Sequence, residues 1–217
     1  YSKTPIFEGL NCEIKPGELV AIKGSNGSGK TTLIKSMVRL LDFDRGQIFY
    51  DNIEINQLSL EWLKKCLIYL PQEPKFIDGN LLDNLLGLSE IKKDKMNEIM
   101  ISVDLSEFVN QHPDGIKMPI FNRGEDLPFG IRKRMALARA LVINGQITIL
   151  DEPTESIDEK GRMAIYNLIK KLSSEKKTII ISTQDSEILN KAKFVIDLDS
   201  KPIPQIIKNK IKVRTNG

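Results

Sequence analysis

A glycine-rich run followed by lysine and threonine is the clearest chemical feature of this 217-residue chain. Residues 24–31 read GSNGSGKT, which matches the pattern G-x-x-x-x-G-K-[ST]. Glycines allow positive φ, so that successive N–H groups can point inward and hold phosphate oxygens. Lys30 would reach the β- and γ-phosphates of a nucleotide, and the Thr31 hydroxyl would bind Mg²⁺. A glycine-rich turn with a chance lysine and threonine is the alternative interpretation. The nucleotide-binding residues predicted from this run are Ser25, Asn26, Gly27, Ser28, Gly29, Lys30, Thr31 and Thr32.

An acidic pair follows a second apolar segment. Residues 147–150 (ITIL) lead directly into Asp151 and Glu152. A carboxylate that ends a buried strand lies at the carboxyl edge of the sheet, where we also expect the phosphate loop. Asp151 would then hold Mg²⁺ through water, and Glu152 would orient or deprotonate a water that attacks the γ-phosphate. Acidic residues often occur at the start of a loop without any function, so the pair alone is weak evidence of a site. Together with the phosphate loop, it indicates a nucleotide site.

Strands and helices must position these groups, and their order predicts the fold class. The phosphate loop lies between a strand expected over 18–23 and a helix expected over 31–41. Strands that alternate with helices are typical of an α/β fold with a mostly parallel sheet. Further strands are expected over 47–50, 67–70, 147–150 and 178–182, and further helices over 94–108, 131–142 and 159–173.

The length of the chain fits one large domain or one domain with a small appended lobe. Residues 81–139 carry little strand signal and several helices, so we expect a helical lobe inserted into a core formed by 1–80 and 140–217. The tail, 194–213, has alternating apolar residues and is expected to form a peripheral hairpin.

Composition excludes several classes of protein. Hydrophobic residues make up 41% and charged residues 28% of the chain, as in folded proteins. The net charge of +3 is too balanced to indicate a nucleic-acid partner. No apolar run approaches the roughly 18 residues of a membrane helix. Cys12 and Cys66 lie far apart and are expected to be buried apolar side chains. A lone histidine, His112, excludes a mechanism that needs several imidazoles.

In their order along nearly the whole chain, these motifs resemble those of the ATP-binding domain of ABC transporters. The resemblance implies a P-loop NTPase core with an antiparallel edge subdomain and an inserted helical lobe, and an ATPase that uses ATP and Mg²⁺. Tyr1 resembles the aromatic residue that stacks on adenine, although it could simply be an exposed terminal residue. Gln72, in LPQEP, is similar to the glutamine that senses Mg²⁺ and couples the nucleotide to the membrane domain. Residues 153–158 (PTESID) resemble the loop that contacts the opposite subunit.

Residues 68–86 resemble exporters more than importers or soluble members of the family. In exporters this domain usually follows a transmembrane domain on the same polypeptide. The resemblance therefore implies that transmembrane domain as a partner, together with a second ATPase domain in a homo- or heterodimer. It also implies a place at the cytoplasmic face of the inner membrane, with no nucleic-acid partner.

Two motifs depart from the family pattern. The signature, usually LSGGQ, corresponds here to 127–131, which read LPFGI. Pro128 has neither a hydroxyl nor an N–H to offer a phosphate, and Phe129 is bulky where the backbone should approach one. The family's switch histidine is replaced by Gln184, which can donate a hydrogen bond to the γ-phosphate but cannot carry the charge of an imidazolium.

These departures leave alternatives open. The leading hypothesis is an ATP-driven exporter domain with weak turnover, in which Glu152 and Gln184 act at the γ-phosphate. The first alternative is a nucleotide-binding regulatory subunit with little or no hydrolysis, and the departures could also be drift in an inactive paralogue. A soluble family member that acts on ribosomes or DNA is disfavoured by the region around Gln72 and by the mild charge.

Overall fold

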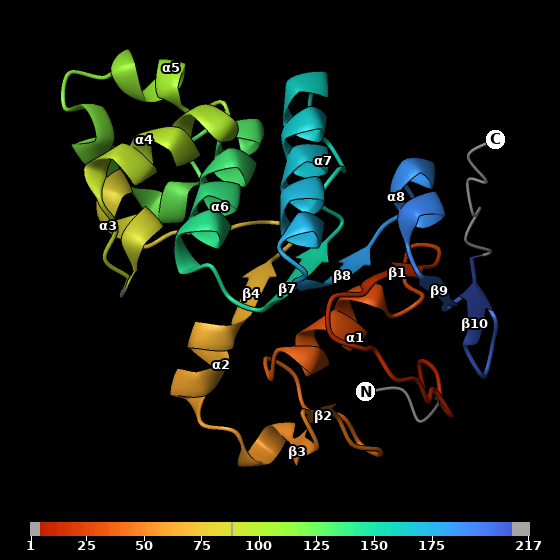
Figure 1. The fold of residues 1–217 in the computed structure, drawn as a ribbon. Coiled ribbons are helices and arrows are strands. Elements are labelled where there is room, and N and C mark those ends of the chain that lie inside the picture. Colours follow the sequence, from red (N-terminus) through yellow and green to blue (C-terminus); the bar gives the residue numbers. More distant parts are fainter. Residues whose placement is uncertain (1–4, 88, 210–217) are drawn as a thin grey trace, which may run out of the picture.

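A computed structural model describes residues 5–87 and 89–209, and its centre is one six-stranded sheet (Figure 1). Every neighbouring pair of strands in this sheet is parallel except the pair at the β10 edge. The predicted α/β class with a mostly parallel sheet is therefore confirmed. The strand order is β10 (Gln205–Lys208), β9 (Phe194–Asp197), β1 (Leu19–Lys23), β8 (Thr178–Ser182), β7 (Ile147–Asp151) and β4 (Leu67–Leu70).

Helices cover both faces of the sheet, which explains why its strands are continuous apolar runs. In β8, Ile179 and Ile181 pack in one cluster with α7 (Glu159–Ser174), while Ile180 packs in another with α1 (Lys30–Met37). The alternation follows from the two-residue period of a strand. Helix α8 (Ser186–Lys191) lies on the same side as α7, and α1 lies on the opposite side (Figure 1).

Two small antiparallel sheets and a group of helices complete the molecule. One pair is β2 (Phe49–Tyr50) with β3 (Ile53–Glu54), and the other is β5 (Gly79–Asn80) with β6 (Pro119–Ile120). A hydrogen bond of 2.9 Å from Nε of Arg139 to the Asn84 carbonyl joins two helices of the remaining group. The four helices of this group lie at one end of the sheet, at the upper left of Figure 1. They are α3 (Leu81–Leu86), α4 (Lys93–Ser102), α5 (Ser106–Asn110) and α6 (Phe129–Ile143). The remaining helices are α2 (Leu60–Cys66) and the short turns η1 (Ile55–Gln57), η2 (Gly115–Lys117) and η3 (Asn122–Gly124).

Two expected helices are wrong in extent because the chain enters the left-handed region. The helix expected over 31–41 ends at Met37, since Arg39 has φ 56° and its N–H returns to the Ser36 carbonyl at 3.1 Å. The helix expected over 94–108 is two helices, and Asp104, with φ 56°, separates α4 from α5.

The tail and the cysteines also differ from expectation. β9 and β10 do pair as a hairpin, but β9 is buried against β1, so the first half of the tail belongs to the main sheet. Residues 210–213 of the expected hairpin lie outside the described residues. Cys12 is exposed and Cys66 is half-buried, so the prediction of two buried cysteines is wrong.

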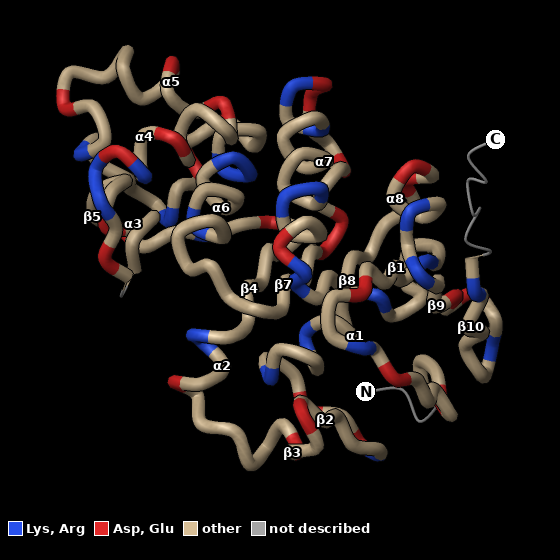
Figure 2. The backbone as a smooth tube through the Cα atoms, viewed as in Figure 1, with Lys and Arg blue, Asp and Glu red and all other residues tan. Residues whose placement is uncertain are grey.

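Charged residues are spread over the molecule. In Figure 2, both basic and acidic residues occur over most of the described chain. Helix α6 is an exception, since it carries four basic residues and no acidic one. Across residues 5–87 and 89–209, no helix combines the length and the apolar character that a membrane span requires.

Candidate functional site

The phosphate loop, residues 24–29, joins the end of β1 to the first residue of α1. Gly29 has φ 107°, in the region that only glycine adopts without strain. At Gly24, an added Cβ would lie 2.3 Å from the Ser28 hydroxyl oxygen, so a larger residue there would require Ser28 to shift. A Cβ on Gly27 would meet nothing within 4 Å, so the backbone at this point faces open space. The loop thus has the conformation and the access that phosphate binding requires.

Lys30 lies inside this loop. Its side chain is 7% exposed, and Nζ donates to the carbonyl oxygens of Gly24 at 2.7 Å and Ser25 at 3.1 Å. Nζ also lies 3.3 Å from Oε1 of Glu152. The structure therefore brings the predicted phosphate cation and the predicted general base together, although they are far apart in the sequence.

The acidic pair stands at the carboxyl end of β7, as predicted. Asp151 is fully buried, and Oδ1 accepts a hydrogen bond of 2.6 Å from the Ser182 hydroxyl. Its other oxygen, Oδ2, has no hydrogen-bond partner among the described residues. A buried carboxylate oxygen without a partner is costly unless it serves a ligand.

Glu152 has its backbone fixed by β8. Its N–H donates to the Ser182 carbonyl at 3.0 Å and to the Ser182 hydroxyl at 2.9 Å. The residue has φ 45°, which is unusual outside glycine. Burial raises the pKa of the Glu152 carboxyl above its ordinary value, and the charge of Lys30 opposes that rise. A carboxylate with a raised pKa is a better proton acceptor near neutral pH.

A cavity of about 290 Å³ connects most of the predicted site residues. Its lining adds two residues that were not among the predicted nucleotide-binding residues, Ile6 and Glu155, the latter within the 153–158 motif. Glu155 accepts a hydrogen bond of 2.6 Å from Nε2 of Gln72, so it joins the predicted site. The predicted residues that line the cavity are Asn26, Gly27, Gly29, Lys30, Thr31, Thr32, Gln72 and Glu152.

The other predicted residues lie around this cavity or outside the described chain. Ser28 is buried beneath the loop, and Asp151 is buried at the end of β7. Gln184 is exposed, and its Nε2 lies 3.4 Å from the Gly24 carbonyl, at the first residue of the phosphate loop. Tyr1, the predicted adenine contact, lies outside the described residues.

Asp199 is a structural support of the loop that sequence reasoning missed. Its carboxylate accepts from the Ser25 N–H at 2.8 Å and from the Ser25 hydroxyl at 2.7 Å. These hydrogen bonds hold the pKa of the Asp199 carboxyl below its ordinary value. Lys201 donates to the Ser28 carbonyl at 3.2 Å on the same side. Because these residues are more than 170 positions from the loop, no local pattern predicts the contacts.

The residues present fit a magnesium–nucleotide group. The Lys30 ammonium and the N-terminal amides of α1 could bind phosphates, since the first turn of this helix has no side-chain cap. Magnesium usually takes one or two carboxylates and relies on phosphates and water for its other ligands. The unpartnered Oδ2 of Asp151 suits that role, with Thr31 and Gln72 at the cavity. The described residues contain no cluster of three or more His, Cys, Asp or Glu that could hold a metal without such help.

The divergent signature stands at the start of α6. Pro128 occupies the N-cap position and supplies no side-chain cap to the helix. The Phe129 ring is half-buried, with Arg132 5.3 Å and Lys133 5.1 Å from its centre. Residues 127–131 do not line the 290 Å³ cavity.

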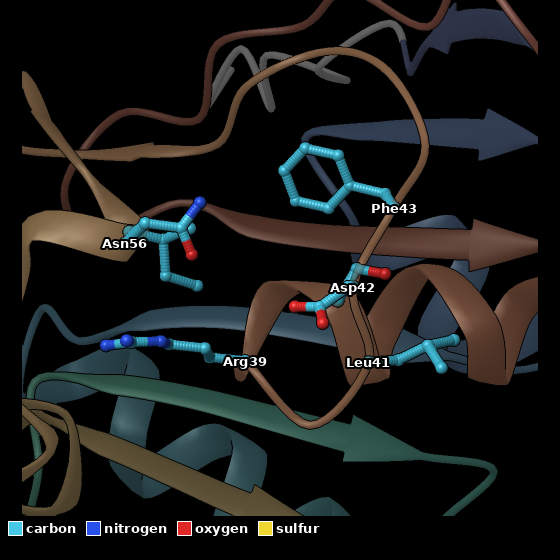
Figure 3. A pocket seen from close by; sticks show the side chains of 7 residues that line it. Arg39, Leu41, Asp42, Phe43 and Asn56 are labelled. Carbon is cyan, nitrogen blue, oxygen red and sulfur yellow. The ribbon is translucent and has the colours of Figure 1, made fainter.

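A second hollow, of about 220 Å³, lies at the carboxyl end of α1 (Figure 3). Arg39, Asp42, Phe43 and Asn56 line it, and Arg39 also donates through Nη1 to the Leu58 carbonyl at 2.8 Å. None of the predicted site residues within the described ranges lines this hollow. The phosphate loop and the acidic pair therefore define the candidate site.

Known proteins with similar sequences include ABC transporters. Curated relatives include "ABC transporter B family member 4" of Dictyostelium discoideum, 32% identical over 85% of this chain and 24% of the relative. They also include the "ATP-dependent lipid A-core flippase" of Francisella novicida, 31% identical over 90% of this chain and 33% of the relative. The chain thus spans a third or less of the length of these relatives.

A solved structure agrees on the fold. The structure of a bacterial Atm1-family ABC exporter with ATP bound superposes with a TM-score of 0.84, over 96% of this chain and 37% of that one, at 24% identity. The family model described as "ABC transporter" matches residues 7–155, which include the phosphate loop and the acidic pair. On this match, and on the relatives that share it, the chain belongs to the ABC transporter family.

Proposed function

We propose that this chain is the ATP-binding domain of an ABC exporter, which binds Mg-ATP and hydrolyses it slowly to drive export. The main support for the proposal is the arrangement of three side chains beside the phosphate loop. Lys30 lies against Glu152, and the neighbouring Asp151 has a carboxylate oxygen without a partner among the described residues. The relatives support export, since they include a lipid A-core flippase and a multidrug resistance protein.

Each residue has a proposed role. Lys30 and the loop amides of residues 25–32 bind the phosphates, and Tyr1 stacks on the adenine. Thr31, Asp151 and Gln72 hold Mg²⁺, which would neutralise charge on the phosphates. Glu152 orients and deprotonates the attacking water, because its burial favours proton uptake. Gln184 hydrogen-bonds to the γ-phosphate.

The proposed partners are a transmembrane domain and a second ATPase domain, at the cytoplasmic face of the membrane. We propose that 1–80 and 140–217 form the nucleotide-binding core and that 81–139 form the lobe. Weak turnover is proposed because Pro128 cannot donate to a phosphate and Phe129 fills the space that a glycine would leave. The same two residues favour the second candidate, a regulatory subunit that binds ATP with little hydrolysis.

Steady-state phosphate release at high protein concentration tests the proposal. Glu152→Gln should keep Mg-ATP binding and lower hydrolysis by at least about tenfold, since an amide cannot accept the proton of water. Glu61→Gln is the matched control, because Glu61 is exposed and, among the described residues, forms an ion pair only with Lys65 on the surface of α2. Equal rates for wild type and Glu152→Gln would remove Glu152 as the base. ATP binding without hydrolysis in the wild type would favour the regulatory subunit.

A further inference from the structure

Lys133 of α6 is a buried cation that neither the fold nor the proposed ATP site explains. Its side chain is only 2% exposed, and it is among the largest fully buried side chains of the described chain. Taking an ammonium group out of water is unfavourable unless the protein supplies partners. An apolar residue of similar volume would avoid this cost, which indicates a role that only a lysine could fill.

Within the part of the chain that the structure describes, all of its hydrogen-bond partners belong to the 152–156 loop, the segment that follows β7. Nζ donates to the carbonyl oxygens of Glu155 at 2.8 Å and Glu152 at 2.9 Å, and more weakly to that of Pro153 at 3.4 Å. These acceptors are neutral backbone groups. Lys133 thus fixes the backbone of the loop. The carboxylates of Glu152 and Glu155 remain available for contacts in the candidate site.

The backbone of this loop needs such support. Glu152 has φ 45° and Ser156 has φ 55°, both in the left-handed region that side chains disfavour. Conformations of this kind persist when the surroundings fix them from more than one side. At Glu152, Ser182 holds the N–H from β8 and Lys133 holds the carbonyl from α6.

The same contacts aim two carboxylates at the candidate site. With its backbone held, Glu152 places Oε1 3.3 Å from Nζ of Lys30. Glu155, whose carbonyl is also held, reaches Gln72 at 2.6 Å. On its other side, Nζ of Lys133 lies 5.1 Å from the centre of the Phe129 ring, at the first residue of α6.

We propose that Lys133 is a positioning residue for ATP hydrolysis, which fixes the 152–156 loop through its carbonyls and ties that loop to the signature position at Phe129. This inference rests on the proposed function. Through Lys133, a structural change at the start of α6 would alter the position of Glu152 in the same chain.

Three variants separate positioning from simple stability. Lys133→Met removes every donor at nearly the same volume, and Lys133→Gln keeps two N–H donors without the charge. Lys177→Met is the matched control. Lys177 is also buried, at 5% exposure, and its Nζ donates to the Asn144 carbonyl at 3.2 Å and to the Asn144 side chain, at the far end of α6.

The first measurement is amide hydrogen exchange of residues 152–156 in each variant without nucleotide. Lys133→Met should speed exchange in this loop by about tenfold or more, because it frees the carbonyls of Glu152 and Glu155. Lys177→Met should leave the loop at the wild-type rate. Wild-type exchange in Lys133→Met would overturn the proposal, and if that variant does not fold, the same comparison with Lys133→Gln decides it.

The second measurement is the kinetics of phosphate release. Lys133→Met should lower kcat by about tenfold with KM changed by less than about threefold, and Lys133→Gln should recover part of the loss. Lys177→Met should leave kcat per folded molecule unchanged. Parallel losses in Lys133→Met and Lys177→Met would contradict positioning. A wild type without hydrolysis would overturn the proposed function alone, because the exchange measurement still decides the role of Lys133 in the loop.

Discussion

Lys30 and Glu152 form an ion pair beside the phosphate loop. The ammonium of Lys30 has three acceptors, the carbonyls of Gly24 and Ser25 and the carboxylate of Glu152. A phosphate that enters the loop must compete with these acceptors for the same cation. Because the pair is mostly buried, its charges attract each other more strongly than surface charges do. The geometry therefore couples phosphate binding to release of the base.

Because Lys133 is buried, the free energy of unfolding should depend on pH in the alkaline range. Burial lowers the pKa of Lys133 to about 8, while the carboxylates of Glu155, Glu152 and Asp151 oppose this shift. Arg132 also lies near the Phe129 ring, with its guanidinium carbon 5.3 Å from the ring centre. Lysine in an unfolded chain has a pKa of about 10.4. Between these two values the unfolded state binds more protons, so the free energy of unfolding should rise with pH.

Urea unfolding of the wild type and of Lys133→Met at pH 7 and pH 10 checks this. The wild type should gain about 2 kcal/mol relative to the variant between the two pH values. A pH-independent difference would mean that Lys133 keeps its ordinary pKa in the folded protein.

At the scale of elements, the site forms where three strands end together. The phosphate loop follows β1, and the acidic pair begins at the last residue of β7. Strand β8 lies between these two strands and supplies Ser182 to both residues of the pair. Helix α6 reaches the same place from outside the sheet through Lys133. The start of α6 is therefore joined to the acidic pair of its own chain while it carries the divergent signature.

The sequence predicted those parts of the site that are contiguous in the chain. Residues 24–31 form a complete local pattern, and 147–150 is an apolar run that must be a buried strand. The supports from Asp199 and Lys133 could not be predicted, since each depends on where a distant segment packs. Helices α2 and α8 have too few residues to show a helical period, so they were missed.

Restoring the family's signature at the start of α6 should raise activity. Changing Pro128 to Ser, Phe129 to Gly and Ile131 to Gln restores donors for a phosphate and removes bulk. The triple variant should dimerise more readily with ATP and hydrolyse it at least about tenfold faster, as expected for two recovered hydrogen bonds to a charged group. The gain should be incomplete, because Gln184 still replaces the switch histidine.

Gln184→His tests the coupling between the two motifs. It should raise activity further, and by a larger factor in the repaired chain than in the unrepaired one, because both groups act on one γ-phosphate. Phosphate release by wild type, the repaired chain, Gln184→His and the combination measures this. If repair changes neither dimerisation nor turnover, the signature does not limit this domain.

At the scale of the whole molecule, the chain spans only a third or less of the curated relatives described above. One copy presents the phosphate loop at its cavity and the divergent signature elsewhere on its surface. A complete site of the proposed kind therefore needs a second ATPase domain that faces the first. Whether two copies of this chain suffice depends on how well residues 127–131 hold a phosphate.

We expect the chain to be mostly monomeric, even with ATP. Pro128 and Phe129 weaken the contact on which the ATP-bound dimer would depend, because neither side chain donates a hydrogen bond. Light scattering with Mg-ATP should give the mass of one chain, and the repaired variant should show the larger mass. A stable ATP-dependent dimer of the wild type would show that its signature is sufficient.

Calorimetric titration of Mg-ATP into the wild type and Lys30→Ala tests the central claim most directly. The wild type should bind, and Lys30→Ala should bind at least about tenfold more weakly, because it loses the cation that offsets the phosphate charge. Lys35→Ala is the control, since Lys35 is an exposed residue of the same helix. It should bind like the wild type. Equal affinity of the wild type and Lys30→Ala would contradict a phosphate-binding role for this loop.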